Sequence, residues 1–245
     1  MRRLSLPLVL ALAVAWVGGS TAAHLRDTVE VPAWAAETDG VVGALKRMGA
    51  DRSRVEVVMA RSHREAAVLA PHVNLARGWN RQADVVRGRL FYERSGGNGG
   101  PAGALTPGAY RRWLDQWAVG FVVLHNGPLD GAWEREYMLV ARGPGYLEPV
   151  WQDENWRIYR VKDPVPMVDP PASVVSSNSA EVVVRMPEPG TVTLRIAYSP
   201  WLRADAGCLD PEHDGGLTRL TASRPGDITI GSGYRYGRQV RRCAA

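Results

Sequence analysis

Lysine and phenylalanine are scarce in this chain of 245 residues. Lys46 and Lys162 are its only lysines, so the other 28 of its 30 basic residues are arginines, against 25 acidic residues. The arginines are scattered among Asp and Glu, which excludes the basic stripe typical of a nucleic-acid binder. The net charge of +5 is compatible with an anionic partner at the cell envelope, such as a phospholipid or a lipid-linked phosphate.

The motifs of several enzyme classes are also missing. No Gly-Lys-Ser/Thr follows the glycines of residues 93–108, so this segment is not a phosphate loop. The sequence has no Gly-x-Ser-x-Gly elbow and no His-Glu-x-x-His pair. Residues 210–215 imitate the start of a calcium loop, but Thr221 stands where a calcium loop requires Glu. We therefore expect no metal, no cofactor and no enzyme activity of the chain alone.

One apolar run is long enough to matter for a membrane. Leu4 to Ala23 carries no charge and follows Arg2 and Arg3. The first interpretation is a signal peptide cleaved after Ala22, and the second is a membrane anchor helix, which needs about 20 apolar residues. Both place the remainder of the chain outside the cytoplasm, because positive charges stay on the cytoplasmic side. The expected location is the extracytoplasmic face of the cell membrane, or outside the cell if the segment is removed.

The chain has only two cysteines, Cys208 and Cys243. Outside the cytoplasm, two thiols in one small module usually oxidise, so we expect a disulfide between them. A loop of this size should contribute about 3 kcal/mol. Zinc is disfavoured because no second cysteine pair lies nearby.

The sequence predicts an α+β protein: a small α/β sandwich domain followed by an antiparallel β-sandwich module, after the N-terminal hydrophobic segment. Four prolines in ten residues indicate a stiff linker between the two units. The expected division is residues 1–23 as signal peptide or anchor, 24–162 as α/β domain, 163–171 as linker and 172–245 as β-sandwich.

Local patterns within the α/β domain support this division. Thr106 and Pro107 predict the start of a helix, as N-cap and first helical residue. The uninterrupted apolar run of residues 119–124 is typical of a strand buried on both faces. Further predicted elements are a helix ending at Gly49, a strand at 55–60, a helix at 133–141 and a hairpin of 147–151 with 156–161.

One polar and aromatic stretch, from residue 61 to 84, shows neither a helix nor a strand period. Arg, Trp, Asn and Gln together suit sugar or phosphate recognition, which uses forked donors and an apolar ring face. A buried network of hydrogen bonds and ion pairs explains the same residues, and we favour it. The candidate ligand-binding residues are His63, Arg64, Glu65, Arg77, Trp79, Arg81 and Gln82.

A resemblance to a known family rests on the order of several pieces between residue 50 and the C-terminus. They are Val55-Glu-Val-Val, His63 to Pro71, Leu75-Ala-Arg-Gly-Trp-Asn-Arg-Gln82, Leu90-Phe-Tyr92, Leu105-Thr-Pro, Tyr110 to Leu114, Val119 to Leu124, Leu129-Asp130, Gly145-Tyr-Leu with Val-Trp151, and Trp156 to Val161. In this order they resemble the extracytoplasmic C-terminal region of large actinobacterial polytopic membrane proteins of the GT-C and YfhO glycosyltransferase-like types.

The resemblance implies a part without the catalytic half, because the catalytic acid of GT-C enzymes lies between early membrane helices that this chain lacks. It also implies that Leu4–Ala23 is the last membrane helix of a split or truncated polytopic protein. We therefore expect a non-catalytic accessory or recognition domain in the assembly of envelope glycans or lipid-linked sugars, beside a polytopic membrane protein or the membrane surface. The alternative is an independent secreted carbohydrate-binding protein.

Overall fold

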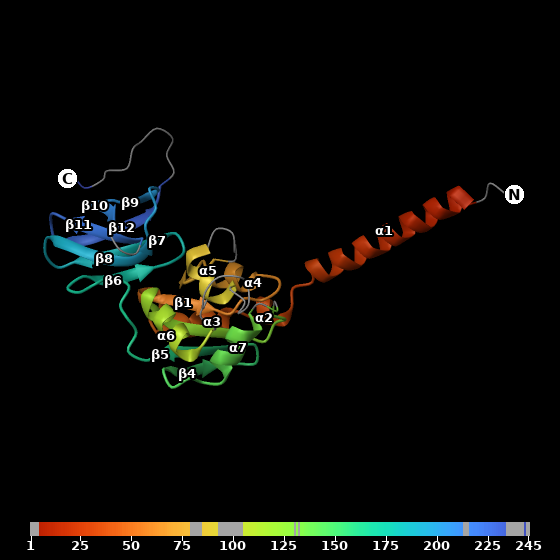
Figure 1. Cartoon of the computed structure of the whole chain (residues 1–245), viewed down its shortest axis with the longest axis horizontal. Coiled ribbons are helices and arrows are strands. Elements are labelled where there is room, and N and C mark those ends of the chain that lie inside the picture. Colours follow the sequence, from red (N-terminus) through yellow and green to blue (C-terminus); the bar gives the residue numbers. More distant parts are fainter. Residues whose placement is uncertain are drawn as a thin grey trace, which may run out of the picture.

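The computed structural model describes residues 5–78, 85–92, 105–129, 131, 133–212, 216–233 and 243. These residues form an apolar N-terminal helix, an α/β domain and an antiparallel β-sandwich (Figure 1). The α+β class, with a small α/β sandwich followed by a β-sandwich after a hydrophobic segment, is therefore confirmed.

The α/β domain is built on a five-stranded mixed sheet with the order β2-β1-β3-β5-β4. The first three strands in this order run parallel, and β5 and β4 complete the sheet antiparallel to their neighbours. All seven residues of β3 are buried, as the apolar run in the sequence predicts. The strands are β1 (Arg54–Val57), β2 (Asn74–Leu75), β3 (Val119–His125), β4 (Leu147–Gln152) and β5 (Trp156–Val161).

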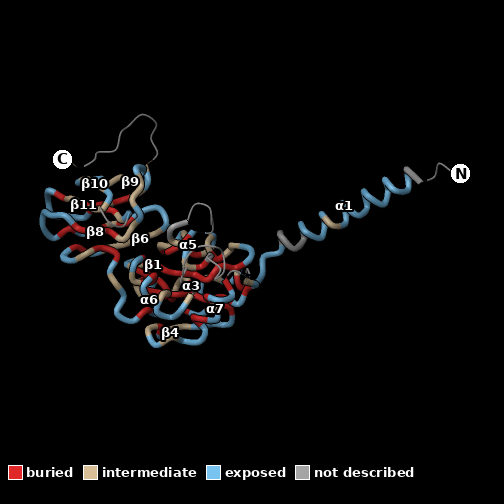
Figure 2. Tube along the Cα trace, in the orientation of Figure 1, coloured by how far each residue is buried: buried red, intermediate tan, exposed pale blue. Residues whose placement is uncertain are grey.

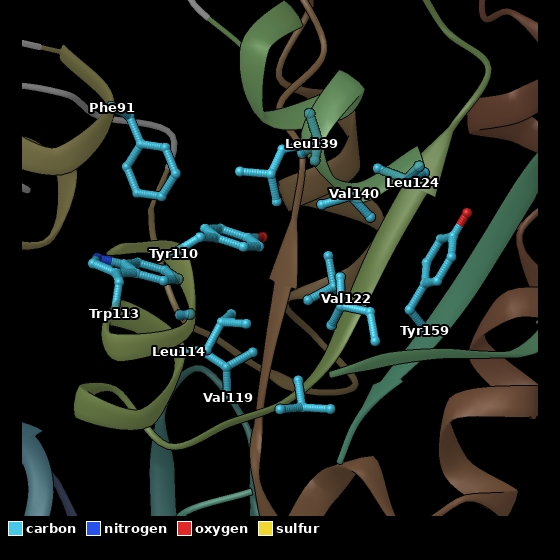
Figure 3. Close-up of a cluster of buried hydrophobic side chains, with 14 of the residues drawn as sticks. Phe91, Tyr110, Trp113, Leu114, Val119, Val122, Leu124, Leu139, Val140 and Tyr159 are labelled. Carbon is cyan, nitrogen blue, oxygen red and sulfur yellow. The ribbon is translucent and has the colours of Figure 1, made fainter. Parts of the chain in front are cut away.

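Helices cover both faces of this sheet because side chains of a strand point alternately to opposite sides. Val122 and Leu124 pack against α5, α6 and α7 (Figure 3), whereas Phe121 and Val123 pack on the side of α2, α3 and α4. The helical segments are α2 (Ala33–Ala36), α3 (Asp39–Arg47), η1 (Ala50–Arg52), α4 (Arg64–Leu69), α5 (Val85–Tyr92), α6 (Pro107–Gln116) and α7 (Glu134–Ala141).

Two helix boundaries follow the local chemistry that the sequence indicates. Thr106 precedes α6, and its Oγ1 accepts a hydrogen bond from Ala109 N at 3.2 Å, while Pro107 is the first helical residue. After α3, Gly49 has φ +71°, a left-handed conformation that favours glycine and ends the helix. The predicted start of α6 and the predicted stop at Gly49 are both confirmed.

The C-terminal module consists of two antiparallel sheets, with the orders β6-β7-β12-β9 and β10-β11-β8. Alternate residues point between the sheets, and Val184, Leu194 and Leu220 are completely buried there. The strands are β6 (Ser173–Ser177), β7 (Glu181–Met186), β8 (Gly190–Ala197), β9 (Leu202–Ala204), β10 (Cys208–Pro211), β11 (Leu217–Ala222) and β12 (Gly226–Ser232).

A disulfide joins Cys208, at the start of β10, to Cys243 near the chain end. Their Cα atoms lie 5.1 Å apart, across a sequence separation of 35 residues. The expected pairing is confirmed, and the bond ties the end of the chain to one sheet of the β-sandwich.

The proline-rich segment 163–171 connects the two domains and is hydrogen-bonded on both sides. Arg111 donates to two main-chain carbonyls at its start, at 2.7 and 2.9 Å, and Arg195 N donates to Met167 O at 2.9 Å. Met167 and Val168 are 1% exposed and belong to the core of the β-sandwich. The division of the chain into two units at this segment stays a prediction.

The α/β domain and the β-sandwich also touch directly. Ser177 Oγ, at the end of β6, donates to the carbonyl oxygen of Asp51 in η1 at 2.8 Å. Ala118, which precedes β3, is completely buried and packs into the core of the β-sandwich. Residues far apart in the sequence therefore meet at a defined junction.

The N-terminal helix α1 (Ser5–Val29) projects away from both domains (Figure 1). Its segment Pro7–Leu25 has a mean hydropathy of 1.7, and none of its residues is buried (Figure 2). Among the described residues, this helix alone is long and apolar enough to cross a membrane. An exposed apolar helix near the N-terminus is typical of a signal sequence or a membrane anchor.

Candidate binding cleft

The candidate residues from the sequence fall at two places at one edge of the α/β domain. His63, Arg64 and Glu65 lie at the start of α4, and Arg77 follows the edge strand β2. Trp79, Arg81 and Gln82 lie outside the described residues. His63 and Arg77 both line a cleft between the α/β domain and the β-sandwich.

Arg77 holds together three segments of the α/β domain through charged hydrogen bonds. Its Nε donates to Glu56 Oε1 at 3.0 Å, and its Nη2 donates to the same oxygen. Nη2 also donates to Glu136 Oε2 at 2.6 Å, and Tyr110 donates its hydroxyl to Glu136 Oε1 at 2.9 Å. These four side chains, from β1, α6, α7 and the end of β2, are buried.

Aromatic rings surround the same guanidinium group. Its Cζ lies 3.6 Å from the ring centre of Phe91, 4.4 Å from that of Trp133 and 5.3 Å from that of Trp113. Rings attract cations through their electron-rich faces, and this attraction grows when water is excluded. The ion pairs and the rings together explain how a charged arginine is accommodated in the core.

The electrostatics of this network follow from its burial. Burial raises the pKa of the Glu136 carboxyl, against the opposing effect of the Arg77 charge. Burial also raises the pKa of the Tyr110 hydroxyl well above 10, and the carboxylates of Glu136 and Glu56 raise it further. The hydroxyl therefore keeps its proton and donates a hydrogen bond to Glu136. Arg77 is therefore a member of a buried network of ion pairs and hydrogen bonds, which is the interpretation that the sequence analysis favours.

His63 and Glu65 form a second pair beside the cleft. His63 has φ +54°, and its Nδ1 lies 3.9 Å from Glu65 Oε1. Glu65 is completely buried, because it lies one turn before Leu69 on the face of α4 that packs toward the sheet. Burial raises the pKa of the Glu65 carboxyl from 4.5 to about 7, and the main-chain N–H groups of Glu65 and Ala60 lower it by less.

This raised pKa predicts a pH-dependent effect of Glu65→Gln. The folded state holds the Glu65 proton more tightly than the unfolded chain, so the contribution of Glu65 is complete below pH 4.5 and is lost as the pH rises through about 7. The difference amounts to about 3 kcal/mol. Urea unfolding should show the variant more stable than wild type at pH 8, with little difference at pH 4.5. An equal difference at both pH values would contradict the assignment.

Burial shifts the pKa of His125 in the opposite direction to that of Glu65, so the stability of wild type alone depends on both groups. The unfolding free energies of the Glu65→Gln variant and of wild type must therefore be compared at each pH. His125 Nε2 lies 2.8 Å from Val58 O, and Gly127 N donates to Nδ1 at 3.0 Å, which fixes a neutral ring with its proton on Nε2. Burial lowers its pKa to about 4, so its contribution is complete above pH 6.5 and is lost as the pH falls through about 4. Because His125 is present in both proteins, their difference isolates Glu65.

The cleft itself has a volume of about 770 Å³, which is in the range of ligand sites. One wall is the edge strand β2, helix α4 and the start of α5, and the other is formed by β7, β9 and β12. The polar lining from the α/β domain is Arg54, Ser62, His63, Asn74, Arg77 and Arg87. The polar lining from the β-sandwich is Asn178, Ser179, Glu181 and Ser232.

Sequence reasoning missed Arg54, Arg87 and Glu181, which line this cleft. Arg54 is the first residue of β1, whereas the strand predicted from the sequence begins at residue 55. Arg87 lies on α5, a helix that the sequence analysis does not predict. No sequence signal brings Glu181 opposite them, since it belongs to the other domain. Among the described residues, no group of three or more His, Cys, Asp or Glu is placed to hold a metal ion.

The fold and the cleft define a two-domain α+β protein with one apolar N-terminal helix of membrane-spanning length. A family model described as a domain of unknown function (DUF8823) matches residues 169–206. This segment runs from the end of the connecting segment through β6, β7 and β8 to β9. No curated protein and no solved structure matches the chain.

Proposed function

We propose that the protein is a non-catalytic recognition domain at the outer face of the cell membrane, which binds an envelope glycan or a lipid-linked sugar. Its partners are the membrane surface or a polytopic membrane protein that performs the chemistry. The resemblance to the extracytoplasmic region of GT-C and YfhO glycosyltransferase-like proteins supports this role. Those proteins are actinobacterial, and the proposal includes an actinobacterial origin for this chain.

The observation that carries the proposal is a roomy cleft, with polar groups on both of its walls, on a body attached to an exposed apolar helix. The cleft combines arginine side chains with hydroxyl and amide groups, the donors that sugar hydroxyls and phosphates require. Helix α1 has the length to hold that cleft near a membrane. The disulfide is consistent with an oxidising compartment outside the cytoplasm.

The topology gives the first test. If Arg2 and Arg3 keep the N-terminus in the cytoplasm, the β-sandwich lies outside. An alkaline phosphatase fused after Ala245 should be active, and a fluorescent protein that folds only in the cytoplasm should stay dark at the same position. An active cytoplasmic reporter and an inactive phosphatase would overturn the location and the recognition role.

Binding gives the second test. The full chain in lipid nanodiscs should bind nanodisc-inserted polyprenyl-phosphoryl-mannose more tightly than polyprenol, which lacks both phosphate and sugar. The variant Glu181→Arg of the full chain places a long cationic side chain in the wall of the cleft. If the lipid binds in the cleft, this variant should change the affinity for polyprenyl-phosphoryl-mannose. Equal binding of the two lipids by the wild-type chain would contradict the proposal.

A secreted carbohydrate-binding protein is the second candidate, favoured by the small residues Ser20-Thr21-Ala22 near the end of the apolar run. N-terminal sequencing of the exported protein separates the two. A mature chain beginning at Ala23 in the medium supports the secreted protein, and an uncleaved chain in the membrane fraction supports the anchored one.

A further inference from the structure

The segment that follows the apolar helix is attached to the α/β domain through one tryptophan. Trp34, in α2, is 4% exposed. Its ring stacks on that of His125, with 4.6 Å between the ring centres, and meets the ring of Trp156 edge-on at 5.7 Å. Trp156 Nε1 donates to the carbonyl oxygen of Trp34 at 2.9 Å. Ring packing and a buried hydrogen bond together hold α2 in one position.

Two further contacts complete this attachment. A Cβ atom at Gly127 would collide with the Trp34 ring, so glycine at this position leaves room for the ring. Asn155, directly before β5, donates from Nδ2 to Glu37 Oε2 at 3.1 Å, just after the end of α2. The α2 attachment is the set of Trp34, Glu37, His125, Gly127, Asn155 and Trp156.

The connection between the apolar helix and this attachment is short. Three residues, Glu30 to Pro32, separate the end of α1 from the start of α2. The apolar segment ends at Leu25. The helical residues 26–29 add about 6 Å, and the extended chain from Val29 to Ala33 adds at most about 14 Å. The start of α2 therefore lies within about 20 Å of the end of the apolar segment.

The α2 attachment and the β-sandwich lie at opposite ends of the five-stranded sheet. His125 is the last residue of β3, and Trp156 is the first residue of its antiparallel neighbour β5. Ala118, before β3, packs into the core of the β-sandwich, and Asp51, before β1, accepts a hydrogen bond from Ser177. The seven residues of β3 place about 20 Å between the two ends. In Figure 1, α1 leaves the α/β domain on the side opposite the β-sandwich.

We propose that the end of the sheet with the α2 attachment is the surface that faces the membrane, and that the β-sandwich projects away from the bilayer. The short connection imposes this orientation, because it keeps the attached end nearest to the lipid. This inference rests on the proposed function in its membrane-anchored form, and it names the surface that meets the membrane.

The charges at this end favour an orientation set by the connection rather than by attraction to lipid. Glu37, Asp153 and Glu154 are exposed there, as are Arg61 and Arg157. A bilayer with anionic lipids attracts clusters of basic residues, whereas acids among the arginines weaken that attraction. The surface should therefore lie beside the lipid headgroups without adhering to them.

The test compares the distances of two exposed positions from the headgroups. Glu154 lies beside the α2 attachment, whereas Ser223 precedes β12, whose other end lines the cleft at Ser232. The full, uncleaved chain is placed in nanodiscs with nickel-chelating lipids, which quench a dye only at short range. A dye on Glu154→Cys should be quenched at least about 3-fold more strongly than one on Ser223→Cys, because the sheet and the β-sandwich each add about 20 Å. Equal quenching, or stronger quenching on Ser223→Cys, would overturn the orientation.

A matched pair of glycine variants tests the α2 attachment. In the labelled Glu154→Cys chain, Gly127→Ala should displace Trp34 and lower the quenching about 2-fold or more, because the freed residues lengthen the connection. Gly131→Ala adds the same methyl group where no other atom lies within 4 Å, and should leave the quenching unchanged. Amide exchange of residues 33–37 should be faster in Gly127→Ala alone, which reports the release of α2. Unchanged quenching and exchange in Gly127→Ala would overturn the role of the attachment.

A longer connection tests the same point with α2 in place. About 30 Gly and Ser residues inserted between Val31 and Pro32 add about 30 Å of average reach. Quenching on Glu154→Cys should then fall toward that on Ser223→Cys. Unchanged quenching would mean that this surface adheres to lipid by itself, and would overturn an orientation imposed by the connection.

The outcomes separate this inference from the proposed function. Stronger quenching on Glu154→Cys, in a chain that does not bind polyprenyl-phosphoryl-mannose, would keep the orientation and overturn the recognition role. Binding of that lipid by a chain with equal quenching at both positions would keep the recognition role and overturn the orientation.

Discussion

Replacing Arg77 with methionine should lower the free energy of unfolding by about 3–5 kcal/mol, because the buried carboxylates of Glu56 and Glu136 then lose the positive charge of Arg77. The side chain is 1% exposed, so water does not take its place. Methionine has a similar length and keeps contact with Phe91 and Trp133, which limits the effect of lost packing. Urea unfolding at pH 7, followed by circular dichroism, measures the change.

Two further variants show whether charge causes the loss. Arg77→Met combined with Glu56→Gln and Glu136→Gln also removes the two carboxylate charges that Arg77 compensates, and should recover part of the stability. Arg185 pairs with Asp227 on the exposed surface of the β-sandwich, so Arg185→Ala should hardly change the melting temperature. A triple variant less stable than Arg77→Met alone would mean that packing, rather than charge, sets the role of Arg77.

Replacing Cys243 with serine should lower the free energy of unfolding of the β-sandwich by about 3–4 kcal/mol. The disulfide closes a loop across 35 residues, and the unfolded chain gains the conformational freedom that this closure removes. The two sheets hold seven short strands around a small core, so a loss of this size is a large part of the module's stability. Thermal unfolding of the full chain, monitored by calorimetry, measures the shift.

The matched comparison is chemical reduction of the wild-type protein. Reduced wild type and oxidised Cys243→Ser should unfold at nearly the same temperature, since both lack the same bond. If reduction leaves the unfolding of wild type unchanged, the disulfide does not stabilise the β-sandwich.

Much of the α/β scaffold follows from local sequence patterns. The N-cap at Thr106, the stop at Gly49 and the buried strand before His125 each depend on chemistry within a few residues. The secondary structure of residues 61–78 could not be predicted, because its elements are too short to show a periodic pattern. Helix α4 has six residues and β2 has two, which is too short for a helical or strand period to appear.

The candidate site depends on contacts that no local pattern encodes. Arg77 meets Glu56 across 21 residues and Glu136 across 59, so the sequence indicates a network without naming its members. The cleft forms only because the β-sandwich docks on the α/β domain, where Ser177 reaches Asp51 across 126 residues.

The connecting segment 163–171 has a consequence for the kinetics of recognition. Arg111 donates hydrogen bonds to carbonyl oxygens at its start, and Arg195 donates to carbonyl oxygens in its middle. Met167 is buried in the core of the β-sandwich. These contacts limit the movement of the two walls of the cleft relative to each other. A preformed site loses little freedom when it is occupied. Association should then proceed in a single concentration-dependent phase without a slow closing step, and differences in affinity among ligands should appear as differences in residence time.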